Sequence, residues 1–155
     1  MTVVDYGDFK NAVYLSCQNH ISEKIQHLQE ALLELKLGAE NESKSSAGDK
    51  HETARAMMHL EQEKITMQLD ELLRQKSELL KIDVTNTSKQ IAKGSLVKTN
   101  RGFLFLSVAI GKIVTDGTPV FSLSMQSPLG KNLNGLVKGD KVTTNGMQYV
   151  VEEVW

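Results

Sequence analysis

The sequence contains little of several residue types, and each scarcity narrows what the chain can be. One cysteine, Cys17, is present among 155 residues, so no disulfide can form within the chain. Aromatic residues make up only 5% of the chain, too few to expect a pocket with aromatic walls. No apolar run is long enough to cross a membrane, and charges stand in the first ten positions, where a signal peptide would be apolar. We therefore expect a protein of the reducing cytoplasm.

Neither positive nor negative charge is in excess. Eighteen Lys and Arg residues stand against 19 Asp and Glu residues, which gives a net charge of −1 at pH 7. A chain of this charge has no general attraction for DNA or RNA, so we expect contact with nucleic acid only through a partner protein. Apolar residues make up 40% of the chain, which is enough for a folded core.

Both prolines and most of the glycines lie after residue 90, which divides the chain into two parts of different composition. The first part is rich in Leu, Glu, Lys and Gln, as is typical of helices, and the second alternates turn residues with apolar runs. Residues 82–90 lose the helical pattern, so we interpret them as a connector. The sequence thus predicts a helical domain over residues 1–82 and a β-rich domain over residues 91–155.

A first helix is predicted from one apolar stripe with steps of three and four residues, and Asp8 is its expected N-cap. The stripe consists of Tyr14, Cys17, Ile21, Ile25, Leu28, Leu32 and Leu35. Gly38 stands where a helix commonly ends, and the small polar residues 39–48 predict a loop. Because the opposite face is charged, this helix needs a partner for its stripe.

A second helix is predicted from Asp49 to Lys81, and its apolar residues repeat every seven positions. The repeat consists of Met58, Ile65, Leu72 and Leu79, with Gln62, Leu69 and Lys76 at the alternate positions. A repeat of this kind is typical of a coiled-coil seam. Because the predicted loop is short, we expect the two helices to pair antiparallel within one chain, as a monomer.

Short strands are predicted in the C-terminal part, at residues 95–99, 103–110, 120–125, 141–144 and 147–154. Asn145-Gly146, between the last two, is a strong signal for a two-residue hairpin. Ser127 followed by Pro128 predicts the start of a short helix, and Gly135 predicts its end. We therefore expect a small antiparallel sheet that carries one short helix.

Candidate chemistry lies at the junction of the two predicted helices, where Asp49 and Glu52 are three residues apart. In a helix this spacing places both carboxylates on one face. The same spacing fits a capping box, in which the two side chains satisfy backbone N–H groups. Both interpretations can hold together, because a carboxylate that accepts one hydrogen bond still offers its other oxygen to a metal.

Other catalytic patterns are missing from the sequence. His51 lies between the two acids, but no second His or Cys stands at the spacing of a helical zinc site. No nucleophile elbow and no phosphate-binding glycine loop occur. The sequence therefore does not predict a catalytic pocket of its own.

The run from Phe121 to Val142 resembles the C-terminal domain of the Gre family of transcription factors. The resemblance rests on a strand followed by Ser-Pro-Leu at 127–129, a short helix that ends in glycine, and Gly-Asp at 139–140 before the final hairpin. Gly94-Ser95 is similar to the start of that domain. The resemblance is therefore specific in both the order and the spacing of its motifs.

The junction of the helices resembles the tip of the same family. Gly-Asp-Lys-His-Glu-Thr-Ala at 48–54 matches both acidic positions and the alanine, and the chain departs from the family pattern at Thr53, Arg55 and Ala56. The tip also resembles that of DksA, a regulator that acts through the same channel of RNA polymerase without cleaving RNA.

This resemblance implies an α+β fold, in which an antiparallel two-helix coiled coil precedes a small FKBP-like antiparallel sheet domain with one short helix. It implies binding to RNA polymerase at the secondary channel, with docking residues Ser127, Pro128, Leu129 and Gly130. Asp49 and Glu52 would be the catalytic and metal-binding residues, holding a Mg²⁺ ion shared with the polymerase and stimulating cleavage of backtracked RNA. The chain itself would not be an enzyme.

Alternatives stay open at this point. A factor that occupies the channel and regulates transcription without cleavage fits the DksA-like tip. A peptidyl-prolyl isomerase or chaperone would fit an FKBP-like domain, although the scarcity of aromatic residues disfavours it. Pro128 and Leu129, finally, would also serve simply to start the short helix and fill the core.

Overall fold

The computed structural model describes residues 5–43 and 48–155 and, within these ranges, leaves out the side chains of residues 41–43 and 48–51. Met1–His20 and Gln75–Trp155 together form one compact unit, here named the sheet unit, and Ile21–Arg74 form the second, here named the hairpin unit. Among the described residues, no helix has the length and apolar character needed to cross a membrane. The predicted domains at 1–82 and 91–155 stay a prediction.

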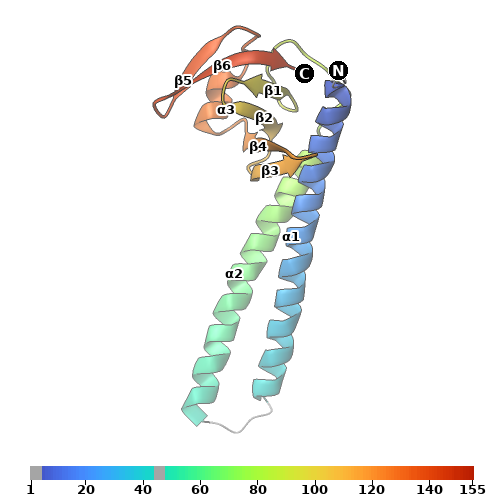
Figure 1. Cartoon of the computed structure of the whole chain (residues 1–155). Helices are drawn as coiled ribbons and strands as arrows, with labels where there is room; N and C mark the ends of the chain where they lie inside the picture. The colour runs from blue at the N-terminus through green and yellow to red at the C-terminus, as the bar shows by residue number, and fades with distance from the viewer. Residues whose placement is uncertain (1–4, 44–47) are drawn as a thin grey trace. The chain divides into compact units, whose positions relative to one another are not determined.

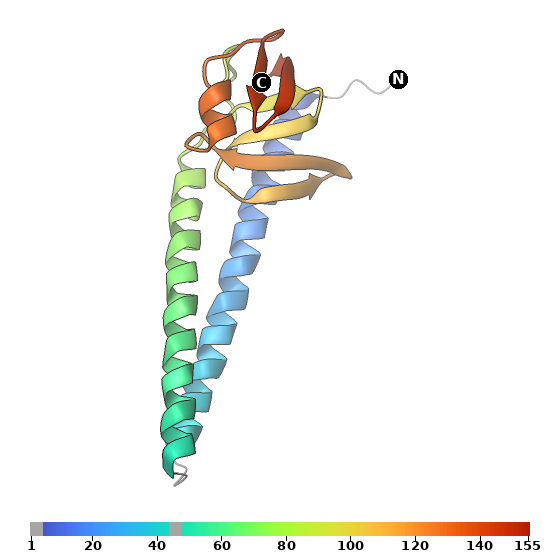
Figure 2. The same ribbon diagram turned by 90° about the vertical axis from the view of Figure 1, so that its left-hand side faces the viewer.

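The hairpin unit consists of parts of two long helices, α1 (Tyr6–Ser43) and α2 (Gly48–Leu80). They lie side by side and antiparallel in this unit (Figures 1 and 2). Ile25 and Ile65 are buried, and Met58 and Leu72 are half-buried. The predicted repeat therefore marks the face of α2 that packs against α1.

The structure corrects both predicted ends of the first helix. The helix begins at Tyr6, and the Asp5 carboxylate accepts hydrogen bonds from the N–H groups of Gly7 at 2.9 Å and Asp8 at 3.4 Å, so the prediction that Asp8 is the N-cap is wrong. It continues to Ser43, so the prediction that Gly38 ends it is wrong as well. A Cβ on Gly38 would lie 3.5 Å from Met58 Cε, an ordinary contact, so glycine is not required there by a close approach of the second helix. Of the predicted loop, residues 44–47 lie outside the described residues.

One predicted seam position of α2 is also wrong. Lys76 is exposed, and Gln75 is half-buried in its place. The Nε2 atom of Gln75 donates a hydrogen bond to the backbone oxygen of Ala109 at 3.3 Å, and Leu79, one turn later, is fully buried. This end of α2 belongs to the sheet unit, where Gln75 takes the inward position next to Ala109, while Leu79 stays buried as the repeat predicts.

The sheet unit contains one six-stranded sheet with the order β3-β4-β2-β1-β6-β5. The strands are β1 (Leu96–Thr99), β2 (Gly102–Ser107), β3 (Gly111–Thr115), β4 (Thr118–Ser124), β5 (Lys141–Thr144) and β6 (Met147–Val154). Neighbouring strands are antiparallel, except that β2 and β4 are parallel. The predicted α+β class is confirmed, and the prediction of a purely antiparallel sheet is wrong in this one pair.

The parallel pair arises because the chain contains a strand that the sequence did not predict. The predicted strand 103–110 ends earlier, at Ser107, and the chain turns through residues 108–110 into Gly111, which has φ +88° and begins β3. β3 then forms a hairpin with β4 through Asp116-Gly117, both with positive φ, as a two-residue hairpin requires. β4 returns antiparallel to β3 and lies between β3 and β2, where it runs parallel to β2.

The two faces of the sheet pack against different helices. On one face, Val97, Leu104 and Leu123 form a core with Leu133 of the short helix α3 (Pro128–Leu133). On the other face, the Phe103 ring lies 5.1 Å from that of Phe9, and Thr115 Oγ1 donates to Ser16 Oγ at 3.0 Å, so this face meets the first part of α1. Figure 2 shows this part of α1 passing behind the strands. Whether the sheet is FKBP-like stays a prediction.

Candidate functional site

The predicted acidic pair lies in the first turns of α2, because this helix begins at Gly48. Glu52 is exposed there. A carboxylate near a helix N-terminus interacts favourably with the helix dipole, and an exposed one is accessible to a cation. The side chains of Asp49 and His51 lie outside the described residues, so the predicted pairing of Asp49 with Glu52 stays a prediction.

The residues that depart from the family pattern follow the pair directly. Thr53 and Arg55 are exposed. Arg55 is three residues after Glu52, a spacing that brings side chains together on a helix surface. The tip therefore carries a fixed positive charge within reach of one of its two proposed metal-binding carboxylates.

The predicted docking residues lie at the start of α3, and three of them have structural roles. Ser127 is the N-cap, since its Oγ accepts a hydrogen bond from the N–H of Gly130 at 3.0 Å and donates one to the Ser124 carbonyl at 2.7 Å. Leu129 packs against the core of the sheet unit. Gly130 is buried, and a Cβ there would overlap the Ser124 carbonyl oxygen. Pro128, the first residue of the helix, is the one that is exposed.

The Gly-Asp motif at 139–140 also has a structural role in the turn before β5. The N–H of Gly139, which has φ +95°, donates to the Val151 carbonyl at 2.7 Å. The Asp140 carboxylate accepts a hydrogen bond from the Val137 N–H at 2.9 Å. The family motifs in this unit therefore fix the local chain path, and their spacing alone does not distinguish this role from docking.

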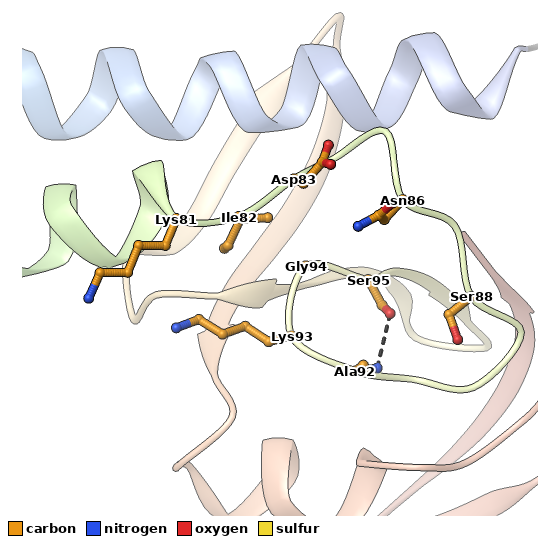
Figure 3. A pocket seen from close by; sticks show the side chains of 9 residues that line it. All are labelled: Lys81, Ile82, Asp83, Asn86, Ser88, Ala92, Lys93, Gly94 and Ser95. Carbon is orange, nitrogen blue, oxygen red and sulfur yellow. Dashed lines mark hydrogen bonds between the residues drawn. The ribbon is translucent and has the colours of Figure 1, made fainter.

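A cavity of about 360 Å³ lies in the sheet unit between the connector and the turn before β1 (Figure 3). Lys81 and Lys93 on its rim both donate to the carboxylate of Glu78, at 3.0 and 2.6 Å. These contacts lower the pKa of Glu78 to about 2, with the bond from Lys93 as the largest cause. These ion pairs join the end of α2 to Lys93 beside the cavity, and spacing alone does not predict the pair with Lys93, which lies 15 residues from Glu78.

Two buried titratable side chains, Lys10 and Cys17, belong to the same unit. Lys10 is 1% exposed, and its Nζ donates to the Asn86 carbonyl at 2.9 Å, which fixes the connector to α1. Burial lowers the pKa of Lys10, and the nearby Asp83 carboxylate partly opposes this. Burial raises the pKa of Cys17 to about 11, so its thiol stays protonated at neutral pH and is not a nucleophile.

The two units carry opposite net charges. The hairpin unit has eleven acidic and seven basic residues, a net charge of −4, while the sheet unit has eight acidic and eleven basic residues, a net charge of +3. The hairpin unit therefore repels nucleic acid, and the sheet unit favours a partner with acidic groups.

Among the described residues, no group of three or more His, Cys, Asp or Glu side chains is placed to hold a metal ion.

Comparison with known proteins gives few matches. No family model matches the chain, and no curated protein matches it. Among solved structures, the chain is similar to the structure of the transcription factor Gfh1, with a TM-score of 0.36 and 18% sequence identity. The similarity covers 90% of this chain and 93% of that one, and at this TM-score it leaves the family of the chain open.

Proposed function

We propose that the chain binds RNA polymerase and uses the acidic start of α2 to act at the polymerase active site. The observation that carries this proposal is the order of its parts. A long antiparallel helical hairpin with Glu52 exposed near its turn precedes a sheet in which Ser127-Pro128 starts the short helix. This is the order that the Gre-type motifs in the sequence predict.

The acidic pair is chemically suited to a magnesium ion shared with the polymerase. Mg²⁺ binds carboxylate oxygens, and it accepts one or two carboxylates from a protein while phosphates and waters supply the rest. The exposed carboxylate of Glu52 and the carboxylate of Asp49, three residues before it, would hold the ion from this chain's side. When bound, the ion would polarise a phosphate and activate water for hydrolysis of backtracked RNA.

A second function, regulation of the polymerase without cleavage, is favoured by Arg55. Its guanidinium is exposed and three residues from Glu52, so it competes with a metal for the same carboxylate. In that case the hairpin would occupy the channel and alter initiation or pausing. The two functions share a partner and differ in whether RNA is cut.

The charge of the hairpin unit supports a protein partner rather than bare nucleic acid. With a net charge of −4, this unit gains no counterion-release energy from DNA or RNA. We therefore expect the chain to reach nucleic acid only when it is bound to polymerase.

The proposal is tested by titrating bacterial RNA polymerase with the full chain and, in parallel, titrating single-stranded RNA and duplex DNA. We expect saturable binding to polymerase and no measurable binding to either nucleic acid at physiological salt. If polymerase does not bind while naked RNA does, the proposed function is wrong.

A further inference from the structure

An apolar patch is exposed on the hairpin formed by β3 and β4. The antiparallel pairing of β3 with β4 places Val114 beside Pro119, and Lys112 beside Phe121. Phe121 is also level with Leu104 of β2, so the patch lies on the face of the sheet that carries α3. Val114 is 60% exposed and Phe121 is 48% exposed, whereas Leu104 is 6% exposed.

The other face of the same hairpin is well covered. Ile113 is 6% exposed and Val120 is 1% exposed, although each lies next to a patch residue in sequence. Because side chains alternate along a strand, this contrast shows that one face of the hairpin is packed and the other is open. The exposure therefore belongs to a surface and does not arise from a frayed strand.

This patch differs from ordinary scattered surface residues in its position. β3 is at the end of the strand order, so Val114 lies on an edge strand, and Pro119 and Phe121 lie on its neighbour β4. An edge with exposed apolar side chains risks aggregation unless a partner covers it or charges guard it. Lys112 is the one charged residue within the two strands.

The patch is also free of the structural roles found at the start of α3. Ser127 caps the helix and Gly130 packs against backbone, so both residues have contacts within the chain. The exposed sides of Phe121 and Val114 make no such contact, and half-exposed aromatic residues are frequent anchors of protein interfaces.

Charge indicates which kind of partner fits. The sheet unit has a net charge of +3, and neither β3 nor β4 contains an acidic residue. Asp116, in the turn between them, is the acid nearest in the chain. Lys112, which lies directly across the hairpin from Phe121, is therefore the charged residue that these two strands place beside the ring.

We propose that Val114, Pro119, Phe121 and Lys112, here named the β3–β4 patch, dock an apolar protein surface edged by carboxylates. This inference rests on the proposed function, under which that surface belongs to RNA polymerase. The aromatic ring and the valine supply the buried contact area, and Lys112 pairs with an acidic group at its border.

The test compares three variants of the full chain in titrations of RNA polymerase. Val114→Thr with Phe121→Ser removes the apolar area, and Lys112→Glu reverses the charge. The control is Val137→Thr with Met147→Ser, which changes two other residues of the sheet unit that are 39% and 41% exposed. Thermal melting and the fluorescence of Trp155, whose ring stacks on Tyr6 at 4.1 Å, check that each variant is folded.

We expect the double patch variant to weaken polymerase binding about tenfold or more, and the control to change it by less than about twofold. Lys112→Glu should weaken binding more at low salt than at high salt. A folded Val114→Thr, Phe121→Ser variant that binds as tightly as the unmodified chain overturns the inference and leaves the proposed function intact. If the unmodified chain does not bind polymerase, the proposed function is wrong, and the inference is overturned with it.

Discussion

Gly130→Ala tests the structural role of the start of α3. Gly130 is buried, and an added Cβ would overlap the Ser124 carbonyl oxygen and lie 2.9 Å from Met125 Cα. Both contacts are with backbone, so no side chain can move aside, and α3 itself would have to shift. The helical preference of Ala over Gly contributes about 1 kcal/mol in the opposite direction, while overpacking of this kind costs about 1–3 kcal/mol or more.

We expect the overlap to win and to destabilise the sheet unit by about 2 kcal/mol, which lowers its melting temperature by several degrees. Gly38→Ala is the matched control. Its Cβ would meet only Met58 Cε, at 3.5 Å, an ordinary contact at the end of a flexible side chain, so stability should be unchanged or rise by up to about 1 kcal/mol. Urea denaturation measures both variants. A Gly130→Ala protein as stable as the unmodified chain would refute this reasoning.

Three further predictions concern the rest of the molecule. Leu72→Asp should destabilise the hairpin by several kcal/mol and leave the sheet unit folded; unchanged helicity and melting by circular dichroism would show that Leu72 is not in the seam. Limited proteolysis should cut first within residues 82–91. The cut should be faster in Lys10→Met, because this variant loses the hydrogen bond to Asn86. Cleavage confined to residues 91–155 would exclude a domain boundary at 82–91. The Glu78 carboxyl should titrate near pH 2 rather than at its usual pKa of 4.5. Because its folded pKa is lowered, its stabilising effect is present above pH 4.5 and is lost as pH falls toward 2, and Glu78→Gln should remove this part of the pH dependence.

Local signals in the sequence predicted the elements whose ends depend on neighbouring residues. Pro128 starts α3 as expected, and Asn145-Gly146 forms the turn between β5 and β6 with φ of 52° and 74°. The seven-residue repeat correctly placed Ile65 against the other helix. In each case backbone geometry or a periodic pattern determines the structure without help from distant parts of the chain.

The errors occur where distant contacts decide. Gly38 reads as a helix end, but α1 continues past it to Ser43. Residues 108–110 read as the end of one long strand, although β2 ends at Ser107 and a separate strand, β3, begins at Gly111. The parallel pairing of β2 with β4 depends on the order in which strands enter the sheet, which no local pattern encodes.

The candidate site was predicted only in part, for a similar reason. The spacing of Asp49 and Glu52 predicts neighbouring carboxylates, and the structure confirms that helix α2 includes both positions. Ser127 to Gly130 matched a family motif, but a motif that builds a helix start looks the same as one that also binds a partner. Phe121 was expected in a strand, yet its exposure follows from which part of the sheet α3 covers, and this appears only in three dimensions.

The measurement that tests the central claim most directly is RNA cleavage in backtracked polymerase complexes. The unmodified chain is compared with Asp49→Ala, Glu52→Ala and with a control, Glu61→Ala, Glu63→Ala, which removes two exposed acids farther along the same helix. Asp49 and Glu52 lie in the first turns of α2, where the interaction of a carboxylate with the helix dipole contributes at most about 1 kcal/mol, so the first variant should remain folded and should still bind polymerase. We predict that the unmodified chain and the control stimulate cleavage and that the tip variant does not. Binding to polymerase without stimulated cleavage at any Mg²⁺ concentration would contradict this account and leave the non-cleaving regulator in its place.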